Sequence, residues 1–154
     1  MKKLKVTQLI IFTFIICLGM ISCSEDDVSN ADLQTRQQIE SNMITGNWAV
    51  TKFIESGKDE THHFNNYNFI FDNNGVLTST NGIITYEGSW SITDSNSNDD
   101  GTDDLDFNIN FNLSNEFEDL NDDWNFISIS ASKIELFDVS GGNGDTDYLT
   151  FEKK

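Results

Sequence analysis

Apolar and polar residues alternate without a break over residues 105–113. Every odd position in this stretch is Leu, Phe or Ile, and every even position is Asp or Asn. Successive side chains of a strand point to opposite faces, so the pattern predicts a half-buried antiparallel strand with a polar outer face. The chain contains no proline, so none of its strands is broken or confined to a sheet edge by one.

Short runs of similar character recur along the chain and are separated by turn-forming residues. Asn74-Gly75, Asn81-Gly82 and residues 141–144 (GGNG) favour the positive-φ turns of hairpins, and residues 131–133 predict another tight reversal. Eight sequential strands with short turns predict an all-β, up-and-down antiparallel barrel, because closure removes exposed edges. An open sandwich is the alternative. The predicted strands are 48–55, 67–72, 76–80, 83–93, 105–113, 124–131, 133–139 and 148–153.

A short helix is predicted before the barrel, at residues 31–43. This segment lacks Gly and Pro, and its sparse apolar residues, Leu33, Ile39 and Met43, indicate a weakly amphipathic helix that covers one end of the domain. We therefore expect one barrel domain over residues 31–154.

The N-terminus has the three parts of an export signal. Three lysines lie within the first five residues, residues 9–21 are almost wholly apolar, and Ser22 and Cys23 follow. The apolar run is shorter than the roughly 20 residues of a spanning helix, although an uncleaved anchor is the alternative. Met20-Ile21-Ser22-Cys23 resembles a lipobox, the processing site of bacterial lipoproteins. The resemblance implies a signal peptide over residues 1–22 and lipid attachment at Cys23, which would hold the domain on a membrane.

An acidic tether follows over residues 23–30. Ser24-Glu25-Asp26-Asp27 resembles the lipoprotein export tag of Bacteroidota, which implies an outer-membrane protein that faces the cell exterior. A solvated linker on a lipoprotein that faces the periplasm is the alternative. Loss of residues 1–22 would remove three lysines and no acid, so the net charge would fall from −17 to −20. Such a negative charge argues against nucleic-acid binding, because the phosphate backbone is also negative. We also expect the protein to be a monomer.

The positions of the two cysteines exclude several classes of chemistry for the mature domain. Cys17 lies within the signal and Cys23 would carry lipid, so the mature domain would have no thiol for a disulfide, a nucleophile or a metal. The phosphate-loop, zinc-protease and serine-hydrolase motifs are absent from the sequence. We expect a protein that is not an enzyme and has no cofactor.

Gly46-Asn47-Trp48, which opens the first strand after the helix, resembles the G-x-W start of lipocalin-like barrels. Residues 148–153 resemble the last strand of small bacterial lipocalin-like lipoproteins. Two departures are evident. Thr146-Asp147-Tyr148 begins the final strand instead of forming the family's mid-barrel T-D-Y motif, and only Lys153 or Lys154 could partly replace the arginine that packs over the tryptophan.

The barrel interior is either packed or hollow. Ten of the twelve Phe, with every Trp and Tyr, lie beyond residue 45, and an eight-stranded barrel can be filled by side chains or can hold one small ligand. Candidates for a ligand site are Trp90, Trp124, Tyr67 and Tyr86, because each offers a ring and a polar tip.

Two groups are weighed as metal sites. Asn96, Asn98 and Asp100, before Gly101, are spaced like calcium ligands, but the first acid and the closing glutamate are missing, so a solvated hairpin tip is the alternative. His62-His63 lies in a polar segment near Asp59 and Glu60, as a surface metal contact or a plain loop. No metal site is assigned.

Two functions remain in view. The first is a surface-anchored binding module for a small apolar or sugar ligand. The second is a structural or protein-interaction lipoprotein with a packed barrel and acidic loops, which would bind calcium if the loop residues are ligands.

Overall fold

The computed structural model describes residues 30–94, 105–139 and 145–154, which form one α-helix, short 3-10 helices (labelled η) and a strongly curved antiparallel sheet. Within the helix, side chains are described from Thr35 onward. The elements are α1 (Asn30–Met43), β1 (Trp48–Glu55), β2 (Lys58–Asp59), η1 (Thr61–Phe64), β3 (Asn68–Phe71), β4 (Val76–Thr80), β5 (Thr85–Asp94), β6 (Leu105–Asn110), η3 (Glu118–Leu120), β7 (Asp122–Ile129), β8 (Lys133–Val139) and β9 (Thr146–Lys153).

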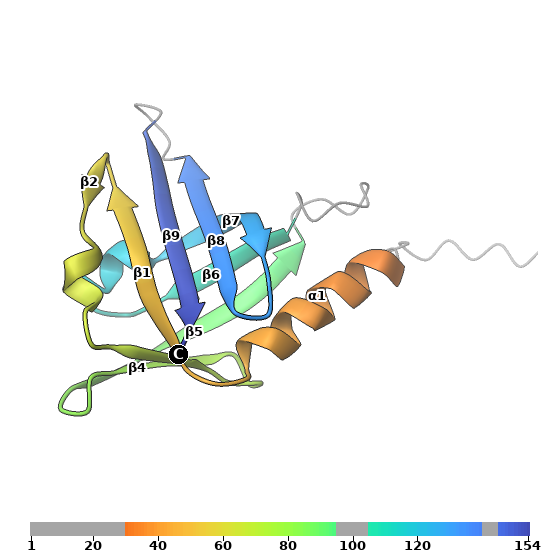
Figure 1. The fold of residues 1–154 in the computed structure, drawn as a ribbon, viewed down its shortest axis with the longest axis horizontal. Helices are drawn as coiled ribbons and strands as arrows, with labels where there is room; N and C mark the ends of the chain where they lie inside the picture. Colours follow the sequence, from red (N-terminus) through yellow and green to blue (C-terminus); the bar gives the residue numbers. More distant parts are fainter. Residues whose placement is uncertain (1–29, 95–104, 140–144) are drawn as a thin grey trace, which may run out of the picture.

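The sheet closes on itself as an eight-stranded barrel, which confirms the predicted fold class (Figure 1). From β3 onward each strand pairs with the next in sequence. β1 completes the ring because it pairs with β9 from Trp48 opposite Lys153 to Ile54 opposite Tyr148, and with β3 at Trp48 opposite Phe69. The two-residue β2 pairs only with the end of β1 and lies outside the ring.

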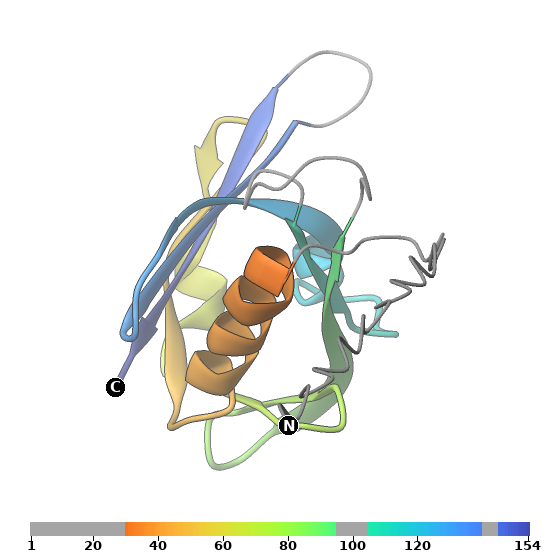
Figure 2. The ribbon, with the colours of Figure 1, turned by 90° about the vertical axis from the view of Figure 1, so that its right-hand side faces the viewer.

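Helix α1 closes one end of the barrel, as predicted (Figures 1 and 2). Ile39 and Met43 are buried against the barrel core, while Leu33 lies outside the described side chains. The Trp48 indole Nε1 donates a hydrogen bond to the Met43 carbonyl at 2.9 Å, which fixes the end of the helix to the first strand. None of the helices in the described ranges has the length and apolarity that crossing a membrane demands.

Lys153 lies over the ring of Trp48, where the lipocalin pattern has an arginine. Its Nζ lies 4.8 Å from the centroid of the Trp48 ring and donates a hydrogen bond to the Asn42 carbonyl at 3.2 Å. The last strand, the first strand and the end of α1 therefore meet at one point.

The predicted strand 105–113 ends three residues early, at Asn110. The alternation persists beyond it, because Phe111 is buried and Leu113 is half-buried. The side chain of Asn121 forms hydrogen bonds with both backbone groups of Phe111. Its Oδ1 accepts a bond from the Phe111 amide, and its Nδ2 donates one to the Phe111 carbonyl. The Asn121 side chain thus supplies the two hydrogen bonds that a backbone partner in the neighbouring strand would otherwise make with Phe111.

The predicted strand 83–93 begins two residues late, at Thr85. The Asn81 Oδ1 accepts hydrogen bonds from the amides of Ile83 and Ile84, which binds both residues into the turn. Ile83 is consequently 92% exposed at the tip of the β4–β5 hairpin.

Aromatic rings fill much of the barrel. Phe71 makes edge-to-face contacts with Trp90, Phe107 and Phe151 at centroid distances of 5.3, 5.8 and 5.5 Å. Edge-to-face geometry is favourable for aromatic pairs, so these contacts add to the burial of the rings. This packing agrees with the filled-interior alternative for the lumen.

Gly88 lets β5 approach β6 closely. A Cβ at this position would lie 2.5 Å from the Asn110 carbonyl oxygen and 2.7 Å from Cδ1 of Phe111. The strand therefore requires glycine here for space.

Candidate functional site

Tyr67 and Tyr86 come together at the end of the barrel that carries η1. Their rings stack with centroids 6.2 Å apart, and Phe117 contacts both rings at 5.0 and 4.7 Å. Burial, followed by the neighbouring Tyr86, raises the pKa of Tyr67. The pair is a half-buried aromatic cluster that packs on the core.

Trp124 lies elsewhere, within the core. It is 1% exposed, and its indole Nε1 donates to the Leu120 carbonyl at 3.0 Å. Its ring meets Phe53 at a centroid distance of 6.4 Å. Its polar tip is bonded to the Leu120 carbonyl, and its described ring contact is with Phe53 and not with either tyrosine.

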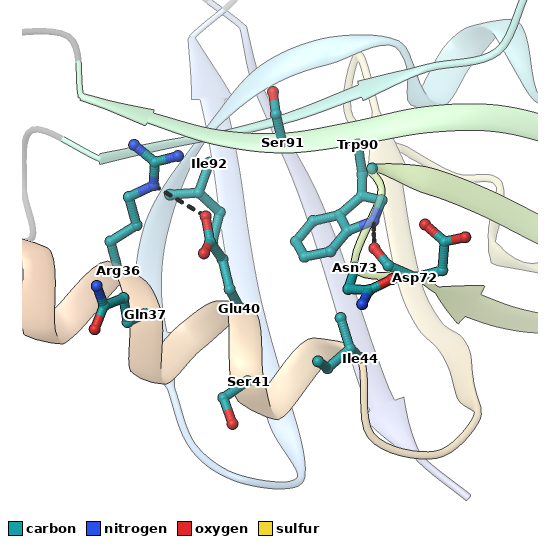
Figure 3. Close-up of a pocket in the computed structure, with 11 residues that line it drawn as sticks. Arg36, Gln37, Glu40, Ser41, Ile44, Asp72, Asn73, Trp90, Ser91 and Ile92 are labelled. Carbon is teal, nitrogen blue, oxygen red and sulfur yellow. Dashed lines mark hydrogen bonds and ion pairs between the residues drawn. The ribbon is translucent and has the colours of Figure 1, made fainter.

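Trp90 forms the apolar wall of a groove between α1 and β5. The groove has a volume of about 390 Å³ and includes Ile44 of the helix end and Ile92 of β5 (Figure 3). Trp90 is 7% exposed, and its Nε1 donates to the Asp72 carbonyl at 3.0 Å. The lining residues are Arg36, Gln37, Glu40, Ser41, Ile44, Asp72, Asn73, Gly75, Trp90, Ser91 and Ile92.

One turn of α1 supplies the charged part of the groove. Arg36 and Glu40 point from the helix toward β5, and the Arg36 Nε lies 2.9 Å from the Glu40 Oε1 (Figure 3). Their spacing of four residues places them on the same helix face. The two charges compensate each other, so this wall is polar without a net charge of its own.

The β3–β4 turn forms the third side of the groove and is tightly held. The Asp72 Oδ1 accepts hydrogen bonds from the amides of Asn74 at 2.8 Å and Val76 at 2.9 Å. These bonds, the one from Val76 first, lower the pKa of the Asp72 carboxyl. The Gly75 carbonyl accepts a hydrogen bond from the backbone amide of Trp90 at 2.9 Å, which fixes the turn beside the strand residue that carries the indole.

This arrangement suits a small molecule that is largely apolar and carries a few hydrogen-bonding groups. The volume lies within the range of ligand sites, and an apolar floor with a few polar groups at its edge is their usual composition. Trp90 is the only one of the four candidate aromatic residues that lines the groove.

The sequence did not point to the remaining walls of the groove. The spacing of Arg36, Glu40 and Ile44 would have placed these residues on one helix face, but nothing in the sequence shows that this face meets β5 and the turn at Asp72. Cys23, Asn96, Asn98 and Asp100 lie outside the described residues.

Comparison with protein-family models gives no match, and neither does comparison with curated proteins. One solved structure to which the chain is similar is a DUF4847 family protein from Bacteroides vulgatus. The two share 18% identity with a TM-score of 0.48, and the alignment covers 75% of this chain and 97% of that chain. The barrel assignment itself rests on the strand pairing described above.

Proposed function

We propose that this protein is a non-enzymatic binding module for a small apolar or sugar ligand, anchored by lipid on Cys23 at the outer face of the outer membrane. The groove between α1 and β5 is the proposed binding site. The observation that carries the proposal is this groove of about 390 Å³, with Trp90 and Ile92 on one side and the helix on the other.

The groove is preferred to the lumen because aromatic side chains occupy the barrel interior. Phe71, Phe107 and Phe151 lie in mutual ring contact there. A ligand in the lumen would have to displace these rings, at a cost similar to that of disrupting a packed core. A ligand in the groove displaces only solvent.

The binding test uses Ile44→Asp, which places a carboxylate in the apolar wall. Titration with the neutral apolar probe N-phenyl-1-naphthylamine should give saturable binding to the unsubstituted protein, as should one member of a panel of methyl glycosides if the ligand is a sugar. Ile44→Asp should weaken binding about three- to ten-fold, because Ile44 is 43% exposed and a ligand would partly desolvate the new carboxylate.

Ile83→Asp is the matched control. Ile83 is 92% exposed at the β4–β5 hairpin and is not among the groove residues. The control should bind the probe as the unsubstituted protein does, and thermal unfolding should show that both variants are folded. Equal loss in both variants, or no saturable binding of any probe, would contradict the groove as the site.

The anchor is tested separately in cells. An alkyne fatty acid should label the protein, and Cys23→Ala should abolish the label because the attachment residue is gone. Protease treatment of intact cells should then degrade the domain if it faces outward. A labelled protein that resists the protease until the outer membrane is opened would place it on the periplasmic side.

A structural or protein-interaction role is the second candidate, and the packed interior favours it. A domain with this role would keep its melting temperature across the whole probe panel, whereas a ligand that binds only the folded state must raise it.

A further inference from the structure

Three metal-ligating side chains converge at the end of the barrel away from α1. The His63 Nε2 lies 3.2 Å from the Glu60 Oε2, and the His62 Nδ1 lies 3.8 Å from the same oxygen. One ligand atom from each of the three residues lies within 4.8 Å of the others. A strand would point adjacent histidines to opposite faces, but η1 brings the two imidazole centroids to 4.0 Å.

The local backbone holds this cluster in place. The Thr61 Oγ1 accepts a hydrogen bond from the Phe53 amide at 2.8 Å and donates one to the Phe53 carbonyl at 3.3 Å. Phe64, which follows the histidines, is buried and packs edge-to-face on Phe53 at 5.4 Å. The residues on both sides of the pair are thus fixed to β1, so little ordering is needed to bring the ligands together.

A second loop contributes a fourth group. The Glu116 Oε1 lies 4.0 Å from the His63 Nδ1, on the opposite side of the imidazole from Glu60. Phe117, the next residue, contacts Phe64 edge-to-face at 5.3 Å, which joins the two segments through the core. In Figure 1 the segments that contain η1 and η3 lie at the end opposite α1.

Surrounding carboxylates make this end attractive to a cation. Burial raises the pKa of Asp119, with Glu118 as the next cause, and burial followed by Asp119 and Asp147 raises the pKa of Glu55. Repulsion from neighbouring carboxylates contributes to both shifts after burial. A bound divalent cation would relieve that repulsion.

We propose that Glu60, His62 and His63 form a binding site for one divalent first-row transition ion of the Zn²⁺ class, and that Glu116, beside the other ring nitrogen of His63, orients that imidazole from the second loop. Zn²⁺ bonds of about 2.0–2.1 Å in tetrahedral geometry separate ligand atoms by roughly 3.3 Å. The separation of 3.2 Å between Glu60 and His63 matches this value, and the 3.8 Å between Glu60 and His62 would close by about 0.5 Å on binding. Two imidazoles favour Zn²⁺, Ni²⁺ or Cu²⁺ over Ca²⁺ and Mg²⁺, which prefer oxygen ligands.

Occupancy would connect two loops that are distant in sequence. Glu60, His62 and His63 precede β3, whereas Glu116 lies between β6 and β7. An ion held by Glu60 and the two imidazoles, with Glu116 facing the far nitrogen of His63, would link the two segments at this end of the barrel and raise the stability of the folded state. The proposed metal site shares no residue with the groove beside Trp90, so a test of metal binding is independent of a test of ligand binding in the groove.

Zn²⁺ titration of the full chain in detergent is the direct test, with Cys17→Ser and Cys23→Ser to remove both thiols. Calorimetry should give one bound ion, and imidazole NMR should show both histidines shifting together, since the chain has only two. His62→Gln and His63→Gln should each weaken binding at least about ten-fold. His62 is the cleaner variant because its side chain is 63% exposed, and circular dichroism checks the fold of both.

Glu116→Gln and Glu118→Gln form a matched pair, since both remove one carboxylate from the same loop. Glu116→Gln should weaken Zn²⁺ binding clearly more than Glu118→Gln. Equal losses in the two variants would show diffuse attraction to an acidic surface and would overturn the assignment of Glu116. Unchanged binding in the His62→Gln, His63→Gln double variant, or no saturation at millimolar Zn²⁺, would overturn the site itself.

Discussion

Replacing Asp122 with asparagine is expected to stabilise the protein more at pH 8 than at pH 5. Asp122 begins β7 and lies half-buried beside Asp123 and Asp138, with one carboxylate oxygen of each of the three within 4.8 Å of the others. Burial, then a hydrogen bond with the Asp123 side chain and repulsion from Asp138, raises the pKa of Asp122 from 3.8 to about 6.

The direction follows from proton linkage. The folded state binds this proton more tightly than the unfolded state does, so the contribution to stability is full below pH 3.8 and is lost as the pH rises through about 6. The full shift corresponds to about 3 kcal/mol. Partial exposure to solvent reduces the effect, and we expect about 1–2 kcal/mol above pH 7.

Urea unfolding followed by tryptophan fluorescence at several pH values between 5 and 8, in the presence of a chelator, measures the effect. Asparagine keeps the oxygen that accepts from the Asp123 amide at 2.9 Å but cannot ionise. The gain in the free energy of unfolding for Asp122→Asn should grow as the pH rises through about 6. Glu87→Gln, on an exposed part of β5, is the control for net charge. An equal gain in both variants, or a gain that does not change with pH, would refute this account of Asp122.

Two further substitutions test the barrel itself. Gly88→Ala should lower the free energy of unfolding by about 1–3 kcal/mol, because the added Cβ would lie 2.5 Å from the Asn110 carbonyl oxygen. Ser89→Ala, on the exposed face, is the control and should change the free energy of unfolding little. Comparable losses in the two variants would argue against the close approach. Lys153→Met should lower the free energy of unfolding by about 1 kcal/mol, because it removes both the charge 4.8 Å from the Trp48 ring and the hydrogen bond to the Asn42 carbonyl. An unchanged midpoint in urea unfolding would show that these contacts add no stability.

The strands were predictable because their patterns are local. Alternation and hairpin residues predicted 48–55, 76–80 and 133–139 with the bounds that the structure gives. Two of the errors arose where a side chain overrode the backbone pattern, whereas β7, predicted over 124–131, begins and ends two residues earlier. Asn121 ends the pairing of β6 at Asn110, and Asn81 draws Ile83 and Ile84 into a turn. Sequence alternation reports burial and cannot show which group completes a backbone hydrogen bond.

The groove was predictable only in part, because it is a tertiary feature. Trp90 was recognised as an aromatic residue with a polar tip, but its partners come from α1 and from the β3–β4 turn. The histidines illustrate the same difficulty: a one-turn η1 helix brings both toward Glu60, and the long-range approach of Glu116 has no local signal.

The pairing of β1 with β9 also governs the order in which the barrel can assemble. Residues 48–54 find their partners at residues 148–153, about a hundred positions later in the chain. A nascent chain that has not yet reached residue 146 can form hairpins but must leave the edges of β1 and β8 open. Contacts of such long range are slow to form. An unfinished chain therefore remains unclosed, and the eight-residue β9 is the strand that completes the ring.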